Sequence, residues 1–325
     1  MSIKNESNEI LKPLQTFIDF WCRKEKNLDG CLVDEPFVEA NIFGYLYSKE
    51  DIERLFNPLT YDLNIKIYNH VATKKEDNAY QYASIIGLFK DKEQAKHLAF
   101  GGTFANKLIK DDGEWMLKDI KFNLQFSDDV GKTYLNKDGL IYRSPGYGDK
   151  SFIKNWMAID DRIGHNMLPL PNMGERMISP DYDTPWYIVK DSDLKLTQEE
   201  QVKELLYKFA YNFDLAAFHA MSEVFTEDVS FKWYEEKFNN RRDTIGYLKM
   251  LKKSTPRAHD SFDIKEVKIN ESKASLVANK ISPDLRNLRK VSNDFNQWID
   301  GTFYLDCIKE DGKWKIKKME YKEAL

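Results

Sequence analysis

The sequence predicts an α+β protein that contains two tandem copies of one domain. The tripeptide Gly-Thr-Phe occurs at 102–104 and again at 301–303, and Trp115 and Trp314 follow at the same 199-residue separation. The length of 325 residues fits about two domains of the usual size. In both halves, segments with helical periodicity come before segments that read as strands, which is typical of helices laid on an antiparallel sheet.

Each repeated block reads as a β-hairpin near the end of its copy. The turns are Lys-Asp-Asp-Gly at 110–113 and Lys-Glu-Asp-Gly at 309–312. Asp-Gly between alternating apolar runs favours a tight turn, because Gly accepts the positive φ that such turns need. A period this long indicates a duplicated domain and not a solenoid.

The second copy has the clearer helix signals. Thr197 and Glu200 form a capping box, which predicts that a long helix begins there. Its apolar face comprises Val202, Leu205, Leu206, Phe209 and Phe213. We expect a shorter helix at 215–225, a turn and strand at 225–233, and a third helix at 243–251. The remaining strands are predicted at 260–269, 273–281, 298–308 and 314–321, giving a cone of helices on a curled sheet.

The first copy has the same order, with helices at 11–21 and 48–56 and strands at 62–68, 79–89, 97–109 and 115–122. The predicted domains are therefore 8–126 and 197–325, with a linker at 127–196. The prolines of that linker argue against a third sheet domain: Pro145, Pro169, Pro171, Pro180 and Pro185. One amphipathic helix is expected there from Phe152, Trp156, Ile159 and Ile163. The linker is either an arm that holds the two domains together or a lid over a cavity.

Composition narrows the class of protein. Net charge is −4 with both signs interspersed, so neither a nucleic-acid partner nor a charged partner is indicated. No apolar run approaches the ~20 residues that span a bilayer, and the first residues lack a signal-peptide core, so a soluble cytoplasmic protein is expected. The three cysteines are unpatterned. No phosphate loop or metal-ligand spacing occurs, so no cofactor and no metal are expected.

Five segments in the second copy resemble a known family when they are taken in order. They are Tyr-Lys-Phe-Ala-Tyr-Asn-Phe-Asp-Leu-Ala-Ala-Phe at 207–218, Val-Phe-Thr-Glu-Asp at 224–228, Arg-Ala-His at 257–259, Gly-Thr-Phe-Tyr at 301–304 and Asp-Gly-Lys-Trp-Lys-Ile at 311–316. Together they resemble the SnoaL-like branch of the nuclear-transport-factor-2-like superfamily over about 197–325. The first copy resembles it only in helix order and final hairpin. The resemblance implies two tandem cone-shaped α+β barrels that pair through their sheets as an intrachain pseudo-dimer, with further self-association left open.

The resemblance also implies a site. In dehydratase members of the family, an Asp that ends the first helix orients a His before a later strand, and these positions fall on Asp214 and His259. A buried carboxylate fixes the imidazole tautomer, and the imidazole then moves a proton next to a carbonyl. A further polar position falls on Asp300, where scytalone dehydratase has a His. The expected substrate contacts are Phe213, Trp233, Tyr234 and Trp298.

Structural readings compete with each of these assignments. Asp214 fits an N-cap of the following helix, and His259 fits a solvated loop histidine. Asp300 beside a glycine fits a turn or a bulge, while Trp233 and Trp298 fit the core.

The first copy lacks the matching residues. Cys22 stands where Asp214 does and Gly101 where Asp300 does, so this copy is expected to be a scaffold. A rearranged site using Asp19 and His70 is the alternative.

Three functions remain open at this stage. The first is a cofactor-independent lyase, of the dehydratase type, or an isomerase, acting on a small hydrophobic cyclic or aromatic carbonyl compound. The second is a protein that only binds a small hydrophobic molecule. The third is a structural pseudo-dimer that serves as an assembly module, in which both cones would be filled with side chains.

Overall fold

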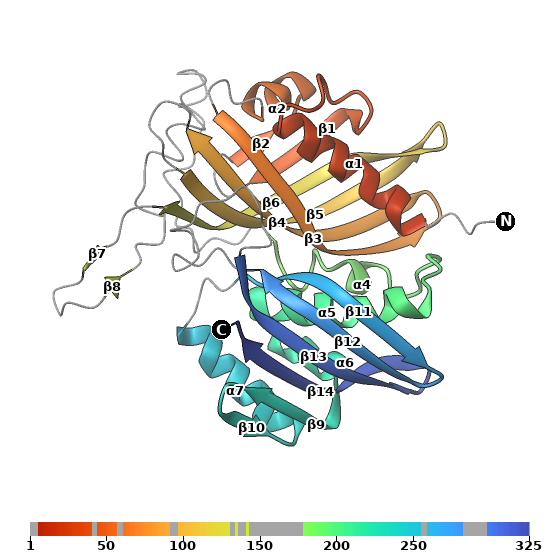
Figure 1. Ribbon diagram of the computed structural model, residues 1–325. Helices are drawn as coiled ribbons and strands as arrows, with labels where there is room; N and C mark the ends of the chain where they lie inside the picture. Colours follow the sequence, from red (N-terminus) through yellow and green to blue (C-terminus); the bar gives the residue numbers. More distant parts are fainter. Residues whose placement is uncertain are drawn as a thin grey trace. The chain divides into compact units, whose positions relative to one another are not determined.

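The computed structural model describes residues 6–40, 44–56, 61–91, 97–130, 134–135, 141–142, 178–254, 259–281 and 298–324. The chain divides into two compact units, Met1–Leu194 and Lys195–Leu325 (Figure 1). Each unit contains a six-stranded sheet within its described residues. The predicted α+β class, with two copies of helices on a curved mixed sheet, is confirmed.

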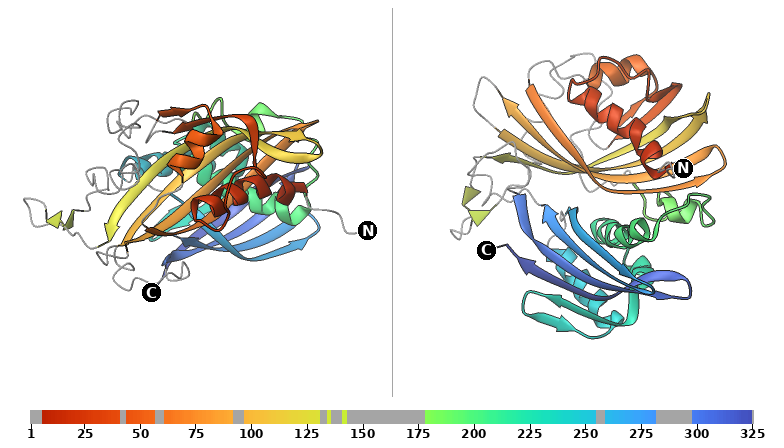
Figure 2. Two further views of the ribbon diagram at one scale, coloured as in Figure 1. Left: turned by 90° about the horizontal axis from the view of Figure 1, so that it is seen from above. Right: turned by 45° about the vertical axis from the view of Figure 1, so that its right-hand side comes forward.

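The first unit places one long helix on the concave side of its sheet (Figure 2). Its helices are α1 (Glu6–Trp21) and α2 (Lys49–Leu55), and its strands are β1 (Leu32–Ala40), β2 (Gly44–Leu46), β3 (Tyr61–Lys75), β4 (Asn78–Asp91), β5 (His97–Asp111) and β6 (Glu114–Val130). The strand order is β2-β1-β6-β5-β4-β3, in which only β1 and β6 run parallel. Phe17 and Trp21 of α1 pack edge-on against aromatic rings of the sheet and form the core of this unit.

The second unit repeats this strand order as β10-β9-β14-β13-β12-β11, with β9 parallel to β14. Its elements are α5 (Gln198–Asp214), η3 (Phe218–Ala220), α6 (Met221–Val224), β9 (Phe225–Trp233), β10 (Glu236–Phe238), α7 (Arg241–Ser254), β11 (Ser261–Asn270), β12 (Lys273–Ile281), β13 (Ile299–Glu310) and β14 (Lys313–Glu323). The predicted capping box is present, because Thr197 and Glu200 bond each other's backbone N–H groups. The shared strand order supports the predicted duplication.

The two repeated turns adopt the predicted hairpin geometry. Asp112 and Gly113 have φ of 45° and 87°, and Asp311 and Gly312 have φ of 50° and 79°. Two consecutive left-handed residues match the twist of the flanking strands, which explains why both turns read Asp-Gly.

The helix predicted at 215–225 is wrong in extent. Ala216 takes a φ of 56°, which a helix does not accept, and helical structure resumes only at η3 and α6. β1 and β2 of the first unit were not predicted as strands, whereas the predicted strands at 62–68 and 115–122 are longer than expected.

The end of the predicted linker packs on the first unit. Residues 178–194 include a short helix, α4 (Pro185–Ile188), which contacts β3 and β4. Thr73 donates a hydrogen bond to the Pro185 carbonyl at 2.9 Å, and Asp183 pairs with Lys121 at 2.9 Å. The predicted linker helix through Trp156 lies outside the described residues, as does most of the proposed lid.

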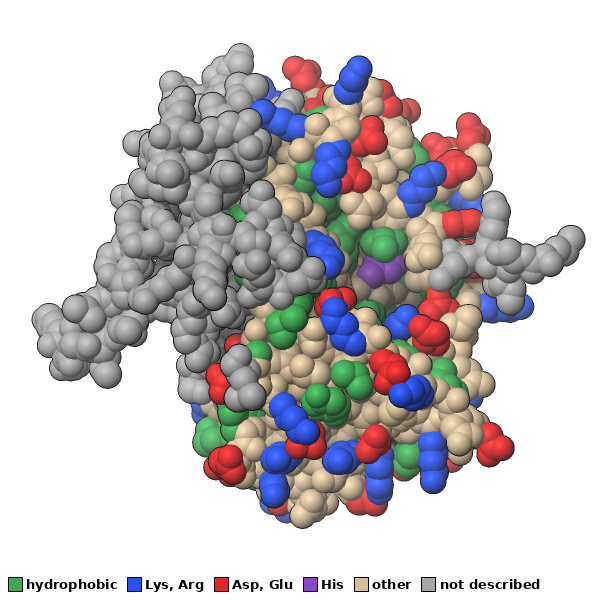
Figure 3. Space-filling model, in the orientation of Figure 1, with side chains coloured by type: hydrophobic (Ala, Val, Ile, Leu, Met, Phe, Trp, Pro, Cys, Tyr) green, Lys and Arg blue, Asp and Glu red, His purple; other side chains and the backbone are tan. Residues whose placement is uncertain are grey.

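None of the helices in the described part of the chain has the length and hydropathy needed to cross a membrane. On the face seen in Figure 3, acidic and basic side chains intermix over the described residues. This distribution agrees with the small net charge of −4.

Candidate active site

Asp214 is the last residue of α5, and its side chain is fully buried. Both carboxylate oxygens accept the backbone N–H of Asp260, at 3.2 Å each. The predicted N-cap role is wrong, because the next helical segment, η3, has Ala217 at its N-cap. The amphipathic face of α5 directs this end of the helix into the interior, which is how a carboxylate becomes buried there.

His259 lies just before β11, and its side chain is 1% exposed. Its Nδ1 is 3.6 Å from Asp214 Oδ2, and its Nε2 is 3.3 Å from the Ser261 hydroxyl. The two predicted residues therefore meet in a buried pair, and the solvated-loop reading is wrong. The separation is slightly longer than a hydrogen bond, which is common for catalytic pairs without a bound substrate.

Asp300 occupies a bulge in β13. The pairing of β12 with β13 shifts here, so that Lys280 faces Gly301 while Ile281 faces Ile299. Asp300 is therefore the extra residue, and bulges commonly redirect a side chain. The Tyr321 hydroxyl donates to its Oδ2 and to its carbonyl oxygen, at 3.1 Å each.

Two charged residues of the site were missed in the sequence, namely Asp260 and Lys280. The Lys280 ammonium lies 3.0 Å from Asp260 Oδ1 and 3.5 Å from Asp300 Oδ2. The alternation along β12 contained a signal, because Ala274, Leu276 and Ala278 face the core and Lys280 continues that series. A lysine near a strand end is usually read as solvated, which hid this position.

The buried charges shift one another's protonation. The pKa of Asp214 is well above its usual range, chiefly because of burial and then because of the nearby Asp260 carboxylate; Lys252 and Lys280 act against this. Burial alone would lower the pKa of Lys280, yet Asp260 and Asp300 raise it above its usual range. The raised pKa of Lys280 favours its ammonium form, and the raised pKa of Asp214 favours the protonated carboxyl group.

The predicted substrate-contact residues divide into two groups. Phe213, Trp233 and Trp298 are buried. The Trp233 ring stacks on Tyr321 with centroids 4.8 Å apart. Tyr234 is 48% exposed and touches Tyr321 edge-on. The core reading therefore fits the three buried rings, and a surface role fits Tyr234.

The two units can be aligned through contacts that they share. The ring centroids of Phe17 and Phe104 lie 6.2 Å apart, and those of Phe209 and Phe303 are also 6.2 Å apart. This alignment places Cys22 opposite Asp214, and the backbone N–H of Ile65 faces the Cys22 thiol as that of Asp260 faces Asp214.

Strand register extends the alignment, because Ile85 pairs with Gly102 as Lys280 pairs with Gly301. The first unit thus has Cys22, Asn64, Ile65, Ile85 and Phe122 at the positions of Asp214, His259, Asp260, Lys280 and Tyr321. Asp300 has no counterpart in the register, because Ile86 pairs with Gly101 where Ile281 pairs with Ile299, so Gly101 matches Asp300 only in the sequence count.

The alternative first-unit site is not formed. Asp19 bonds Lys24 and Gln15, whereas His70 bonds Gln81 at 2.9 Å. Burial lowers the pKa of His70 to about 4, with the Gln81 hydrogen bond acting against it, so this imidazole stays neutral. The described contacts of Asp19 and His70 do not bring them together.

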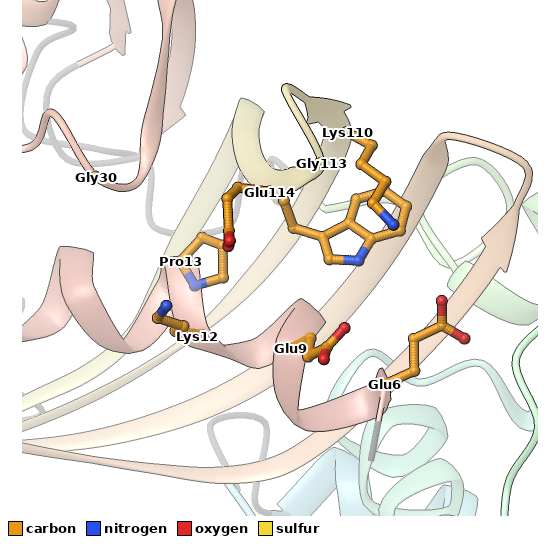
Figure 4. Close-up of a pocket in the computed structure, with 9 residues that line it drawn as sticks. Glu6, Glu9, Lys12, Pro13, Gly30, Lys110, Gly113 and Glu114 are labelled. Atoms are coloured by element: carbon orange, nitrogen blue, oxygen red, sulfur yellow. The ribbon is translucent and has the colours of Figure 1, made fainter. Parts of the chain in front are cut away.

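A pocket of about 480 Å³ lies in the first unit, between the first half of α1 and the β5–β6 hairpin (Figure 4). Its walls include Glu6, Glu9, Lys12, Lys110 and Glu114. Several of these side chains are already engaged: Glu6 pairs with Lys74, and Lys110 lies 5.6 Å from the Trp115 ring centroid. No predicted site residue lines this pocket, so we place the candidate site in the second unit.

Comparison with known proteins supports the predicted resemblance. Residues 195–320 match the family model of the SnoaL-like domain. No curated protein matches the chain.

Solved structures of similar shape each align with part of the chain. A nuclear-transport-factor-2-like protein of unknown function from Shewanella oneidensis is 20% identical over 38% of this chain and 98% of its own, with a TM-score of 0.30. A type 2 hexachlorocyclohexane dehydrochlorinase is 13% identical over 42% and 96%, with a TM-score of 0.36. A putative scytalone dehydratase from Novosphingobium aromaticivorans is 10% identical over 43% and 95%, with a TM-score of 0.34.

Proposed function

We propose that this chain, whose second unit is a SnoaL-like domain, is a cofactor-independent lyase or isomerase. The substrate class is a small hydrophobic cyclic or aromatic carbonyl compound. The observation that carries the proposal is the buried Asp214–His259 pair, with 3.6 Å between Oδ2 and Nδ1. Burial of a titratable pair is costly unless something compensates for it, and perturbed groups of this kind concentrate at functional sites.

The chemistry is proton transfer beside a carbonyl group. The His259 imidazole accepts the proton on the carbon next to the carbonyl, and the C–H electron pair moves into an enolate. Returning the proton to another carbon of the conjugated system completes an isomerisation. Delivering it to a hydroxyl on the adjacent carbon expels water and leaves a double bond, which completes a dehydration. Neither route needs an oxidant, so a single acid–base pair is sufficient.

The neighbouring residues support this assignment of roles. Asp214 orients the imidazole through Nδ1. Ser261 lies at Nε2, so its hydroxyl either rotates away or relays the proton when a substrate is present. The core of the second unit, which includes Phe213, Phe303 and Trp233, is rich in aromatic rings, which favours an aromatic substrate for a pocket that opens within it.

The alternative is a structural or ligand-binding module. The described interior of the second unit contains closely packed rings, with Phe209–Phe213 and Phe303–Tyr321 centroids at 6.2 and 5.0 Å. This packing favours a filled cone, as an assembly module would have. A binding protein would need a cavity but no proton transfer.

The test measures proton transfer without knowledge of the natural substrate. The probe is 2-tetralone, an aromatic cyclic ketone, whose α-protons exchange with D₂O at a rate measurable by NMR. We expect the wild-type chain to accelerate this exchange and His259→Ala to lose about 10²-fold of the acceleration. His219→Ala, at an exposed position of the same unit, is the matched control and should keep the wild-type rate.

Two results would contradict the proposal. If 2-tetralone binds and His259→Ala leaves the exchange rate unchanged, the protein belongs to the binding class. If the wild-type chain neither binds nor accelerates exchange of this ketone, or of 2-cyclohexenone as a smaller cyclic probe, the assembly reading is favoured.

A further inference from the structure

Lys280 occupies an unusual position for a lysine. Its side chain is 14% exposed at the end of the inward-facing series of β12. The ammonium lies between two carboxylates, 3.0 Å from Asp260 and 3.5 Å from Asp300. It also lies 5.7 and 5.9 Å from the ring centroids of Trp233 and Tyr321. An ammonium held this way loses most of its hydration, so the surrounding groups have to replace it.

The same ion pair is connected to the candidate acid–base pair. Asp260 follows His259 in the chain, and its backbone N–H bonds both oxygens of Asp214 at 3.2 Å. Two buried carboxylates, Asp214 and Asp260, are therefore neighbours. Like charges at close range cannot both be ionised cheaply, unless a cation offsets one of them.

We propose that Lys280 is a positioning residue of this site: by neutralising Asp260, it determines where the proton of the Asp214–His259 pair resides. The catalytic role of Lys280 rests on the proposed function. Its effect on the protonation of the Asp214–His259 pair can be measured without any substrate. Lys280 places its positive charge 3.0 Å from the Asp260 carboxylate, so the two form an ion pair beside Asp214. Asp214 and His259 can then share one proton between them.

The charged groups that face the pair come from several elements. Lys252 of α7 acts on Asp214. Asp260 precedes β11, Lys280 lies on β12 and Asp300 on β13, and Tyr321 of β14 donates to Asp300. Asp300, which accepts from Tyr321, is thus one counter-charge of the Lys280 ammonium. Asp260 is the other, and its backbone N–H also bonds Asp214.

The first unit shows that these residues occur together or not at all. At the positions of Asp260, Lys280 and Tyr321 it has Ile65, Ile85 and Phe122, and its β4–β5 pairing lacks the bulge that carries Asp300. The unit that lacks the acid–base pair also lacks the whole ion-pair network. This joint absence fits groups that act as one electrostatic assembly.

The experiment is an NMR titration of the His259 ring in the full-length protein without ligand. In Lys280→Met the uncompensated Asp260 carboxylate favours the imidazolium, so the His259 pKa should rise by about one unit or more relative to wild type. In Asp260→Asn the Lys280 ammonium retains only Asp300 as its counter-charge, so the His259 pKa should fall relative to wild type. The double variant Lys280→Met/Asp260→Asn removes both charges and should titrate close to wild type. Lys280→Arg keeps the charge and is the matched control.

The outcomes separate the inference from the proposed function. Unchanged titration of His259 in both single variants, or shifts that add in the double variant instead of cancelling, would overturn the role of Lys280. If Lys280→Met does not fold, the test is the His259 pKa in Asp260→Asn compared with that in Lys280→Arg. A lower pKa in Asp260→Asn supports the role of Lys280, and an equal pKa overturns it. The predicted shifts in a protein that fails to exchange 2-tetralone protons would support the electrostatic coupling while contradicting the lyase or isomerase proposal.

Discussion

The two units of this chain share a backbone plan and differ in what they bury at one end of it. Both have the same strand order and the same Asp-Gly hairpin, and both pack a phenylalanine of the long helix onto the matching ring of the sheet. The second unit buries Asp214, His259 and Asp260, whereas the first has Cys22, Asn64 and Ile65 there. Because uncharged residues complete the first unit at these positions, the fold itself does not require the buried charges.

Nearer the hairpins it is the first unit that buries polar side chains, whereas the second unit has apolar ones. The first unit buries Gln81 and Asn106, which face each other across β4 and β5. Three of their amide atoms find no hydrogen-bond partner among the described residues. The second unit has Leu276 and Leu305 at the matching positions, both buried. At the positions compared, the polar group of one unit therefore has an apolar counterpart in the other at Ile65 and Ile85 and at Leu276 and Leu305.

The strongest test of the comparison introduces the carboxylate of the second unit into the first. Cys22→Asp places a partly buried acid near Ile65 and Ile85, where the second unit has Asp260 and Lys280. We expect a loss of about 3–5 kcal/mol in unfolding free energy at pH 8. Burial raises the folded-state pKa of such an acid above its unfolded value, so the loss should shrink as the pH falls toward 4.

Denaturant unfolding at pH 4 and pH 8 measures this effect, with Cys22→Ser as the uncharged control. A loss that is equal at both pH values would show that the position is more solvated than the structure indicates.

A reciprocal exchange tests the level nearer the hairpins. Leu305→Asn should destabilise the second unit by about 2–3 kcal/mol, because it removes buried apolar surface and adds an amide without a partner. Asn106→Leu should stabilise the first unit by about 1 kcal/mol, because an unsatisfied amide is removed. Hydrogen exchange resolved by peptide assigns each change to its unit. Destabilisation by Asn106→Leu would indicate that the amide is satisfied in solution.

The raised pKa of Asp214 predicts a pH-dependent stability. A buried acid that binds its proton more tightly in the folded state stabilises the protein at low pH, and this contribution is lost as the pH rises above the unfolded value near 3.8. Asp214→Asn removes that dependence, so its stability should improve relative to wild type by about 1 kcal/mol or more between pH 4 and pH 8. Thermal unfolding across this range measures the difference. A relative loss with rising pH would mean that Asp214 is ionised and stabilised in the native state.

The smallest difference between the units is expected at their thiols. Burial raises the pKa of Cys22 to about 11 and that of Cys31 and Cys307 to about 12. All three should react slowly with a thiol reagent at pH 8 in the native protein, with rates within about tenfold of one another. Mass spectrometry of the labelled peptides gives the three rates. Fast labelling of Cys22 alone would show that its end of the first unit opens.

The sequence was informative where a local pattern decides the structure. Thr197 with Glu200, and Asp311 with Gly312, specify their helix start and turn through their own backbone geometry. The meeting of Asp214 and His259 was predictable only from the family resemblance, because 45 residues separate them in the chain. Asp260 and Lys280 were missed because their burial depends on strand pairing, and the left-handed Ala216 had no glycine to signal it.

The most direct test of the account is a crystal structure of the full-length chain soaked with 2-tetralone. We predict one ketone in the second unit, with its α-carbon within about 3.5 Å of a His259 ring nitrogen or the Ser261 hydroxyl. The first unit should have no ketone near Cys22 and Asn64. A second unit whose interior is filled by its own side chains, or a ketone bound only in the first unit, would contradict the assignment of chemistry to the Asp214–His259 pair.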